Sequence, residues 1–398
     1  MAKKRTSKKT AKKRGPASVV DPVSDETEGN PTASILRQPP EVLFADELQQ
    51  LAQADTFPRP PGWRLSARAV RTFILGSAAA PLEEETSVSR KFYGDDPLVD
   101  RAIVTLIGNR GLMLIGEPGT AKSMLSELLS AAISGGSELT IQGTAGTTED
   151  QIKYGWNYAL LLSEGPTARS LVPAPLHRGL SAGRVVRFEE ITRCPAEIQD
   201  TLISVLSDKV LHIPEFDNQH AVLHARPGFN IIATANTRDR GVNEMSAALR
   251  RRFNFETVHP IADPVFELQL VMRQAESLLQ SSGSPAQLSE SAVRVLVDTF
   301  HELRSGRTIQ GAIVEKPSSV MSTAEAVSVV MSAGLDAYHF GDGKVTASHL
   351  GRQLTGAVLK DDTSDAKKVR QYFEVVVKPR AQSDSDWKDF YRAGEMLK

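Results

Sequence analysis

The segment 112–123 carries the residue types that bind a triphosphate. Four apolar residues predict a buried strand, closely spaced Gly and Pro residues predict a tight loop, and Lys122 with Ser123 begins a predicted helix. Loop N–H groups and a helix N-terminus attract an anion, the lysine adds positive charge, and the hydroxyl can ligate Mg²⁺. The alternative is an ordinary strand-to-helix turn. The residues expected to contact a nucleotide are Gly116, Glu117, Pro118, Gly119, Thr120, Ala121, Lys122, Ser123 and Met124.

Paired carboxylates follow a second apolar strand. Residues 185–191 read Val-Val-Arg-Phe-Glu-Glu-Ile, so Glu189 and Glu190 end a predicted strand that Arg187 interrupts. In nucleotide hydrolases one such carboxylate holds Mg²⁺ through water, and the next polarises the attacking water. The usual pair is Asp-Glu, and the extra methylene of Glu189 displaces its carboxylate by about 1.5 Å, which leaves the hydrolysis rate open. The alternative is two solvated glutamates at a helix start.

A third apolar strand ends in an amide, and a run of arginines comes after it. Asn236 closes the strand 229–235, where its side chain can hydrogen-bond a γ-phosphate and the attacking water. Arg250, Arg251 and Arg252 are expected on a helix, where three consecutive residues cannot share a face, so at least one should point to solvent. Another can supply positive charge to a phosphate on a neighbouring subunit. The plainer interpretation is a basic surface patch.

The elements that position these residues alternate between strand and helix from Lys91 onward, which favours an α/β fold with a parallel sheet. After Pro264 the pattern becomes mostly helical. The expected strands are 112–115, 139–142, 185–188, 229–234 and 253–258; the expected later helices are 265–279, 289–303 and 323–335, with polar loops at 361–367 and 381–386. We expect four regions: a basic tail (1–40), accessory helices (41–85), a nucleotide-binding core (86–262) and a smaller helical domain (263–398).

The two accessory helices are predicted from apolar periodicity. The first covers 41–54, with Val42, Leu43, Leu48 and Leu51 on its apolar side. The second begins after Ser66 and runs to Leu75.

The composition places limits on the class of protein. The chain has 398 residues, 40% of them hydrophobic, which is enough for two or more compact domains. No run approaches the ~18 apolar residues that a membrane span needs, and the N-terminus lacks the apolar core of a secretory signal. Cys194 is the only cysteine, which fits a reducing cytoplasm. We therefore predict a cytoplasmic protein without a membrane anchor.

The near-zero net charge of −1 conceals a basic N-terminus. Eight Lys and Arg residues fall within the first fourteen positions, so the rest of the chain is acidic. Such a tail cannot bury enough apolar surface to become ordered, and we expect disorder to about Thr32. It is either a solvated tail or an electrostatic contact for nucleic acid or an acidic partner.

In chain order, these segments resemble the AAA+ ATPases, and more narrowly their MoxR branch. The matching segments are the lead-in 92–100, the phosphate loop 116–123 with its Ala121, the Walker B segment 189–202, the strand end 233–241 and the arginine segment 248–253. The likeness covers residues 90–260 well and the later helices more loosely.

The resemblance implies a role for each site residue. Gly116, Gly119 and Lys122 would hold the phosphates of ATP, Ser123 the Mg²⁺, Glu189 the water shell of the metal, Glu190 the attacking water and Asn236 the γ-phosphate; Arg252 or Arg251 would act in trans. The resemblance also implies a doubly wound five-stranded parallel sheet, a hairpin of 210–213 with 221–224, and a ring, usually a hexamer. An insert at 143–175 would carry Tyr154, Trp156 and Tyr158 either in the core or facing a pore.

The helical domain departs from the family pattern. The family usually has a sensor-two arginine just inside a lid helix, and residues 315–325 contain none. Ser322 or Thr323 with Glu325 instead reads as a capped helix start. Either lid motion is coupled to ATP differently, or Arg304 or Arg307 substitutes.

Three functions remain open at this point. The leading one is an ATP-driven remodeller of protein clients, chaperone-like, with a partner that carries a von Willebrand A domain. The second is a nucleic-acid motor or loader, which the basic tail motivates, although no recognition helix is evident. The third is a slow nucleotide-dependent switch or scaffold, which Glu189 and the absent sensor arginine motivate. A small-molecule kinase fits least, because it needs no arginine in trans.

Overall fold

We describe the chain from a computed structural model, which defines Met1 and residues 37–77, 88–216, 221–237, 243–318, 321–358 and 363–394. The predicted basic tail, except for Met1 and residues 37–40, lies outside these ranges. The same holds for residues 238–241, the last part of the strand end that resembles the MoxR branch.

Five parallel strands form the central sheet, in the spatial order β2-β5-β8-β1-β9. They are β1 (Gly111–Gly116), β2 (Thr140–Gln142), β5 (Val185–Glu189), β8 (Asn230–Asn236) and β9 (Phe253–Val258). The predicted α/β class, the five strands and their parallel arrangement are confirmed. In the register Gly116 pairs with Asn236, and Phe188 pairs with Ala233. The carboxyl ends of β1, β5 and β8 therefore meet at one edge, where open α/β sheets bind ligands.

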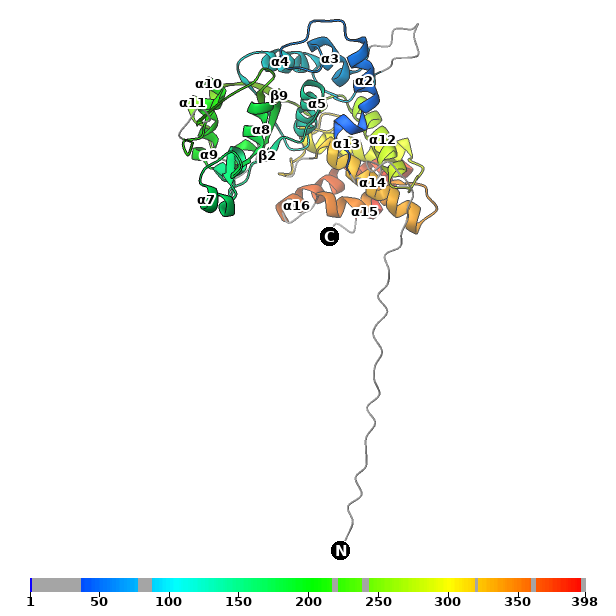
Figure 1. Ribbon diagram of the computed structural model, residues 1–398. Coiled ribbons are helices and arrows are strands. Elements are labelled where there is room, and N and C mark those ends of the chain that lie inside the picture. Colours follow the sequence, from blue (N-terminus) through cyan, green and yellow to red (C-terminus); the bar gives the residue numbers. More distant parts are fainter. Residues whose placement is uncertain are drawn as a thin grey trace. The chain divides into compact units, whose positions relative to one another are not determined.

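Helices cover both faces of the sheet (Figure 1). Leu112 and Leu114 of β1 face a core that includes α3 (Ala67–Leu75), α4 (Asp96–Ile107) and α5 (Lys122–Ser134). Met113, between them, faces the opposite core with α8 (Pro175–Ala182) and α10 (Leu202–Ser207). This alternation is the period-2 pattern of a strand that is buried on both sides.

The first accessory segment differs from the prediction. It consists of two helices, α1 (Pro40–Leu43) and α2 (Ala45–Ala54), separated at Phe44. The Phe44 ring packs edge-on against Phe73 at 6.0 Å, and Leu43 is 58% exposed rather than apolar and inward. The second helix is confirmed as α3, and the Ser66 side chain accepts a hydrogen bond from the Ala69 N–H at its start.

The shorter elements of the core include the predicted hairpin, in which β6 (Val210–His212) pairs antiparallel with β7 (Val222–His224). The segment before it contains α6 (Glu149–Ile152), β3 (Tyr154–Trp156), α7 (Tyr158–Glu164) and β4 (Leu171–Pro173). Glu215, beside the hairpin, accepts hydrogen bonds from the Tyr154 hydroxyl and the Trp156 indole. Tyr154 and Trp156 are half-buried against this loop, whereas Tyr158 is exposed. The remaining short helices are η2 (Ile191–Arg193), α9 (Ala196–Asp200) and α11 (Ala247–Arg250).

The later part of the chain is helical, as predicted, and has its own hydrophobic core. Its elements are α12 (Pro264–Ser281), α13 (Glu290–Ser305), α14 (Thr323–Phe340), α15 (Ala347–Val358), α16 (Thr363–Tyr372), η4 (Phe373–Val377), α17 (Lys378–Arg380) and α18 (Ser385–Gly394). The predicted capping box of Ser322 with Glu325 begins α14. The loop predicted at 361–367 is wrong from Thr363 onward: α16 starts there, and buried Asp365 accepts hydrogen bonds from the Ser318 N–H and hydroxyl. Among the described residues, none of the helices combines the length and apolar character that a membrane crossing requires.

Candidate nucleotide-binding site

The loop between β1 and α5 is tightly folded. Ala121, directly before α5, has a left-handed backbone with φ 65°. A residue with a Cβ pays about 1–2 kcal/mol for this conformation and glycine pays none, which explains why a glycine is usual at this position. Gly119 is also left-handed, and a Cβ there would come within 2.2 Å of the Ser322 hydroxyl oxygen. The phosphate loop therefore lies directly against the start of α14.

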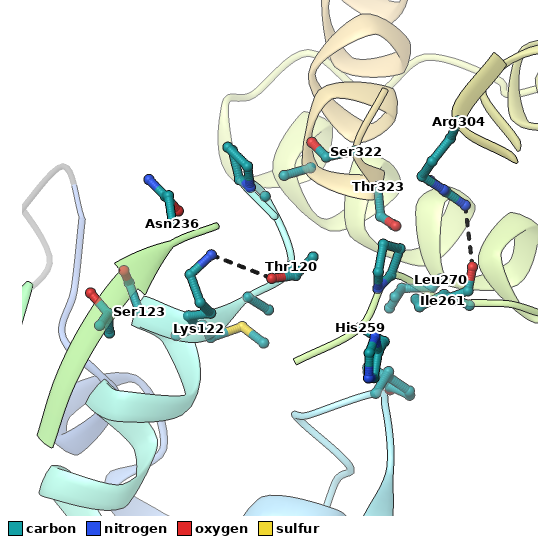
Figure 2. Close-up of a pocket in the computed structure, with 18 of the residues that line it drawn as sticks. Thr120, Lys122, Ser123, Asn236, His259, Ile261, Leu270, Arg304, Ser322 and Thr323 are labelled. Atoms are coloured by element: carbon teal, nitrogen blue, oxygen red, sulfur yellow. Dashed lines mark hydrogen bonds between the residues drawn. The ribbon is translucent and has the colours of Figure 1, made fainter. Parts of the chain in front are cut away.

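Lys122 is held over this loop. Its ammonium donates to the carbonyl oxygens of Gly116 at 3.1 Å and Glu117 at 2.7 Å, and it lies 3.5 Å from the Thr120 hydroxyl (Figure 2). The ammonium therefore sits where β1 ends and α5 begins, beside the helix N-terminus. A phosphate bound there would meet a cation and a helix dipole together.

Glu189 is buried behind Ser123. The Ser123 hydroxyl donates to Glu189 Oε2 at 2.7 Å, and the Thr234 hydroxyl donates to the same oxygen at 2.8 Å. Burial by itself raises the pKa of this carboxyl, but the Arg187 charge and the hydroxyl hydrogen bonds outweigh burial and hold its pKa below the usual value. Glu189 is therefore an anion at neutral pH.

This arrangement fits a magnesium–nucleotide complex. Because the Ser123 proton is directed at Glu189, the lone pairs of the same oxygen are free to face a cation in the cavity that Ser123 lines. Within the described ranges, no group of three or more His, Cys, Asp and Glu side chains is placed to hold a metal alone. Mg²⁺ typically binds through one or two protein groups together with substrate phosphates. Ser123 and Glu189 would hold the metal in that way.

Glu190 has a strained backbone that directs its side chain away from Glu189. Its φ of 53° is left-handed, and its N–H donates to the Thr234 hydroxyl at 3.0 Å. Its carboxylate pairs with Arg193 at 2.8 Å. Thr234 thus contacts both glutamates, through the side chain of one and the backbone of the other. Strain of this kind concentrates at functional sites.

One cavity of about 390 Å³ brings together most of the predicted site residues. The predicted residues that line it are Pro118, Gly119, Thr120, Ala121, Lys122, Ser123, Met124, Glu190 and Asn236. Gly116, Glu117 and Glu189 are not part of the lining. Gly116 and Glu117 contact Lys122 through their carbonyl oxygens, and Glu189 contacts Ser123. Neither Arg251 nor Arg252 lines the cavity.

The arginine run differs from the prediction because only its first member is helical. Helix α11 ends at Arg250, and the next two residues form the turn into β9. Arg250 and Arg251 are exposed. Arg252 is half-buried and donates to the Ser207 hydroxyl at 2.8 Å and the Ala248 carbonyl at 2.6 Å. Arg251 is therefore the freer of the two predicted trans arginines.

The helical domain contributes a wall of the cavity that the sequence only partly predicts. Of the two arginines considered as substitutes for sensor two, Arg304 lines the cavity, whereas Arg307 is exposed and does not. Arg304 donates to Glu267 and to the Met321 carbonyl oxygen. It also donates to the Ile261 carbonyl oxygen (Figure 2). Ser322, Thr323 and Ala324 at the start of α14 complete this wall.

Away from the phosphate loop the cavity is lined by Tyr93, His259, Pro260, Ile261, Leu270 and Gln274. The Tyr93 ring packs against Phe266 at 5.4 Å, and its hydroxyl accepts a hydrogen bond from Arg273. Flat and apolar side chains of this kind suit a nucleobase. The cavity therefore has a charged end and a flatter, more apolar end.

Thr234 is the main site residue that sequence reasoning missed. Its signal was available, because alternate residues of a strand point the same way and Thr234 stands two positions before Asn236. Ser126 was missed for a different reason: it lies one turn after Ser123 on α5, and only the sheet order brings it to Glu189.

Two family descriptions together match most of the chain. Residues 111–253 match the AAA domain (dynein-related subfamily), and residues 266–398 match the YehL-like AAA+ ATPase C-terminal domain. The uncharacterized protein YehL of Escherichia coli (strain K12) is 49% identical over 369 residues, which cover 92% of this chain and 99% of YehL. Chaperone MoxR1 of Mycobacterium tuberculosis is 28% identical over 217 residues, which cover 53% of each chain.

The similar solved structures are more distant in sequence. NtrX from Brucella abortus in complex with ADP is 13% identical with a TM-score of 0.45, over 76% of this chain and 64% of that one. The Thermotoga maritima RuvB Holliday junction branch migration motor is 15% identical with a TM-score of 0.42, over 71% and 76%. The activities of these two proteins do not transfer to this chain.

Proposed function

The chain belongs to the YehL-like AAA+ ATPases of the MoxR type, and on that premise we propose that it hydrolyses ATP with Mg²⁺ in a ring oligomer to remodel client proteins. The observation that carries the proposal is the shared cavity. Lys122, Glu190 and Asn236 come from three different segments and line the same space. Phosphoryl transfer needs positioned charge more than covalent chemistry, so a site with these three groups is suited to it.

Each residue has a proposed role in hydrolysis. Lys122 and the loop N–H groups bind the phosphates, and Ser123 with Glu189 holds Mg²⁺, which would neutralise charge on the phosphates. Glu190 polarises the attacking water, and Asn236 contacts the γ-phosphate. Arg304 takes the place of the sensor-two arginine, because it reaches the cavity from the helical domain.

The ring and the client are supported by separate observations. Arg251 is exposed and does not line the cavity of its own chain, so its charge is available to a neighbouring subunit. The named relative MoxR1 is a chaperone, which favours a protein client. The partner that carries a von Willebrand A domain is proposed from the resemblance to the MoxR branch alone. We propose a cytoplasmic hexamer, with the domain boundaries predicted from the sequence.

The decisive experiment measures ATP turnover per subunit across a range of protein concentrations. Wild type should hydrolyse ATP with Mg²⁺, and turnover per subunit should rise as the ring assembles. Glu190→Gln should bind ATP and lose turnover by about 10²-fold or more, as expected when a general base is removed. Glu197→Gln is the matched control, because Glu197 is exposed on α9 and does not line the cavity.

Two results would refute parts of the proposal. Turnover that survives in Glu190→Gln would remove that residue from the reaction. Turnover per subunit that is independent of concentration, in a protein that remains monomeric with ATP, would exclude the ring. A mixture of Arg251→Ala and Glu190→Gln subunits tests action in trans, because each subunit type then supplies what the other lacks.

A further inference from the structure

Arg187 is a buried arginine inside the Walker B strand. It is 5% exposed, and every other residue of β5 is buried too. An arginine in such a place destabilises the fold unless its charge and its N–H groups are all paired. The sequence shows it only as an interruption of an apolar strand, so its purpose has to be read from its contacts.

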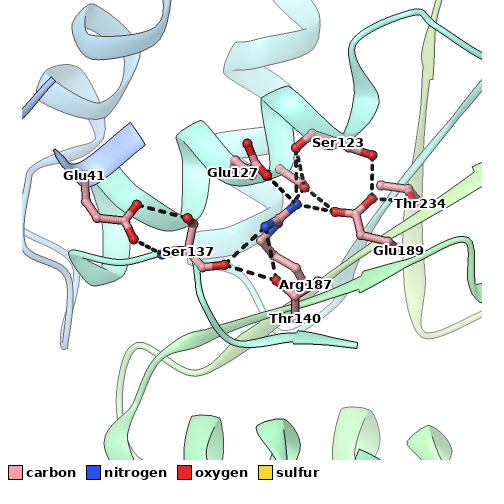
Figure 3. Close-up of polar contacts among 9 residues, drawn as sticks. Glu41, Ser123, Glu127, Ser137, Thr140, Arg187, Glu189 and Thr234 are labelled. Carbon is pink, nitrogen blue, oxygen red and sulfur yellow. Dashed lines mark hydrogen bonds and ion pairs between the residues drawn. The ribbon is translucent and has the colours of Figure 1, made fainter. Parts of the chain in front are cut away.

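The guanidinium of Arg187 is bound on all sides (Figure 3). Its Nη2 donates to Glu189 Oε1 at 2.7 Å and lies 3.4 Å from Glu127 Oε1, and its Nε donates to the Ser126 hydroxyl at 2.9 Å. Its Nη1 donates to the Ser137 carbonyl and the Thr140 hydroxyl, both at 3.1 Å. These contacts fix the orientation of the Arg187 guanidinium.

The carboxylate of Glu189 is divided between two sets of partners. Oε1 accepts from Arg187 and from the Ser126 hydroxyl at 2.7 Å. Oε2 accepts from the hydroxyls of Ser123 and Thr234. One oxygen therefore anchors the group to the protein interior, and the other contacts the serine that faces the cavity.

The length of Glu189 matters for this division. An aspartate on the same backbone would retract the carboxylate by about 1.5 Å, one carbon–carbon bond. Contacts of 2.7–2.8 Å on both oxygens cannot all survive such a movement. Glu189 replaces the usual aspartate because only the longer side chain can contact Arg187 and the hydroxyls at the same time. Arg187 is tolerated in the strand because Glu189 pairs with its charge.

We propose that Arg187 is a positioning residue that orients Glu189 for the magnesium–nucleotide complex, and that Arg187 and Glu189 work as one unit that requires glutamate rather than aspartate. The inference rests on the proposed Mg²⁺-dependent ATP hydrolysis. Groups that orient a metal ligand change metal affinity without touching the metal. Arg187 reaches the cavity only through Glu189 and the serines, which is the position of such a group.

The test uses nucleotide binding rather than turnover. The affinity of the full-length protein for a fluorescent ATP analogue is measured in EDTA and across a Mg²⁺ titration. In Arg187→Met, the affinity in EDTA should stay within about threefold of wild type, and the Mg²⁺ concentration at half effect should rise about tenfold or more, the usual cost of losing a group that orients a metal ligand. Arg184→Met is the matched control: Arg184 lies three residues earlier and pairs with Glu138, away from Glu189.

A double-mutant cycle tests the unit itself. Glu189→Asp alone should also raise the Mg²⁺ requirement, because the shorter side chain leaves one set of partners. The double variant Arg187→Met with Glu189→Asp should raise the Mg²⁺ concentration at half effect no more than the larger single effect does, because both changes break the same contact between Arg187 and Glu189. If Arg187→Met folds poorly, Arg187→Lys keeps a positive charge beside Glu189 and Glu127 but cannot reproduce the fork of guanidinium hydrogen bonds. It should fold and still show the raised Mg²⁺ requirement, and a requirement equal to that of wild type would overturn the inference.

The outcomes separate this inference from the proposed function. A wild-type protein whose ATP binding and turnover ignore Mg²⁺ would overturn the proposed function. A wild type that depends on Mg²⁺, with an Arg187→Met variant whose Mg²⁺ titration superimposes on it, would overturn only the inference. Strictly additive effects in the cycle would show that Arg187 and Glu189 act separately, and would also overturn it.

Discussion

Two buried glutamate–arginine pairs flank the same cavity. In the core, Glu189 pairs with Arg187 at 2.7 Å; in the helical domain, Glu267 pairs with Arg304 at 2.6 Å. Both carboxylates are almost fully buried, with exposures of 5% and 0%. Each pair has therefore lost its hydration and depends on good geometry to recover that cost.

The pairs differ in which charge faces the cavity. In the core, the arginine lies deepest, and the anionic Glu189 contacts the cavity through Ser123. In the helical domain, Glu267 lies deepest, and Arg304 itself lines the cavity. The core thus presents an anion that suits a metal cation, and the helical domain presents a cation that suits a phosphate. In the proposed function, the same two residue types, oriented oppositely, would serve the metal and the triphosphate of one ligand.

The largest expected effect comes from breaking the pair in the helical domain. Arg304→Met leaves the buried Glu267 without its arginine and with only the Thr323 hydroxyl and His301 beside it, so the free energy of unfolding should fall by about 3–5 kcal/mol, measured by urea unfolding. Its ATP affinity should fall equally with and without Mg²⁺, unlike that of Arg187→Met, because Arg304 lines the cavity itself and its proposed contact is with the phosphates rather than the metal. Arg294→Met, which breaks an exposed pair with Glu290 on the same helix, is the control. An ATP affinity that changes only when Mg²⁺ is present would erase the distinction between the two pairs.

Acidification acts on both carboxylates. Burial by itself raises the pKa of Glu267, but the neighbouring His301, 4.0 Å away, and the hydrogen bonds from Arg304 outweigh burial and hold the pKa below its usual value, as for Glu189. A lowered folded-state pKa stabilises the fold above the unfolded-state value, about 4.3 for glutamate, and this stabilisation is lost as the pH falls through the lower folded-state value. Between pH 7 and pH 3, the unfolding free energy of Glu267→Gln should therefore fall less steeply than that of wild type. If the unfolding free energies of wild type and Glu267→Gln fell in parallel as the pH decreased, the lowered pKa of Glu267 would be contradicted.

Two matched threonine variants compare the two regions with a smaller expected loss of unfolding free energy. The Thr234 and Thr323 hydroxyls donate to Glu189 and Glu267 at 2.8 and 2.7 Å. Valine at either position should lower the unfolding free energy by about 1–3 kcal/mol, because a buried acceptor loses its donor. Thr234→Val should lower ATP turnover much more than Thr323→Val, since Thr234 also accepts the Glu190 N–H. Equal turnover in the two variants would show that Thr234 has no special position.

The smallest effect is expected at the outer end of the core network. Glu41 on α1 accepts hydrogen bonds from the Ser137 N–H and hydroxyl, and the Ser137 carbonyl accepts one from Arg187. Glu41→Gln should lower the unfolding free energy by about 0.5–1.5 kcal/mol, the worth of an ordinary hydrogen bond, and leave the Mg²⁺ requirement within about twofold of wild type. A larger change in that requirement would mean that the accessory helix α1 influences the metal site.

Features with a local physical cause were predictable from the sequence. The phosphate loop, the five strands, the helix start after Ser66 and the Ser322–Glu325 capping box each follow from residues within one short segment, whose spacing reports the preferences of the backbone. The roles assigned to these residues remain proposals. The prediction was wrong where a contact between distant residues determines the local structure. Helices α1 and α2 separate at Phe44, which packs on Phe73, and α16 begins beside Asp365, which accepts hydrogen bonds from Ser318.

The sequence by itself determined that two polar strand ends and a glycine-containing loop exist, because each is encoded by its immediate neighbours. Only the tertiary structure decided which of them meet. The strand order places β5 beside β8 and α5, so an arginine that looks like a defect in an apolar strand becomes the anchor of Glu189. It also selected Arg304 over Arg307 as the cation at the cavity. Such choices depend on the packing of elements far apart in the chain, and no local preference of the backbone encodes that packing.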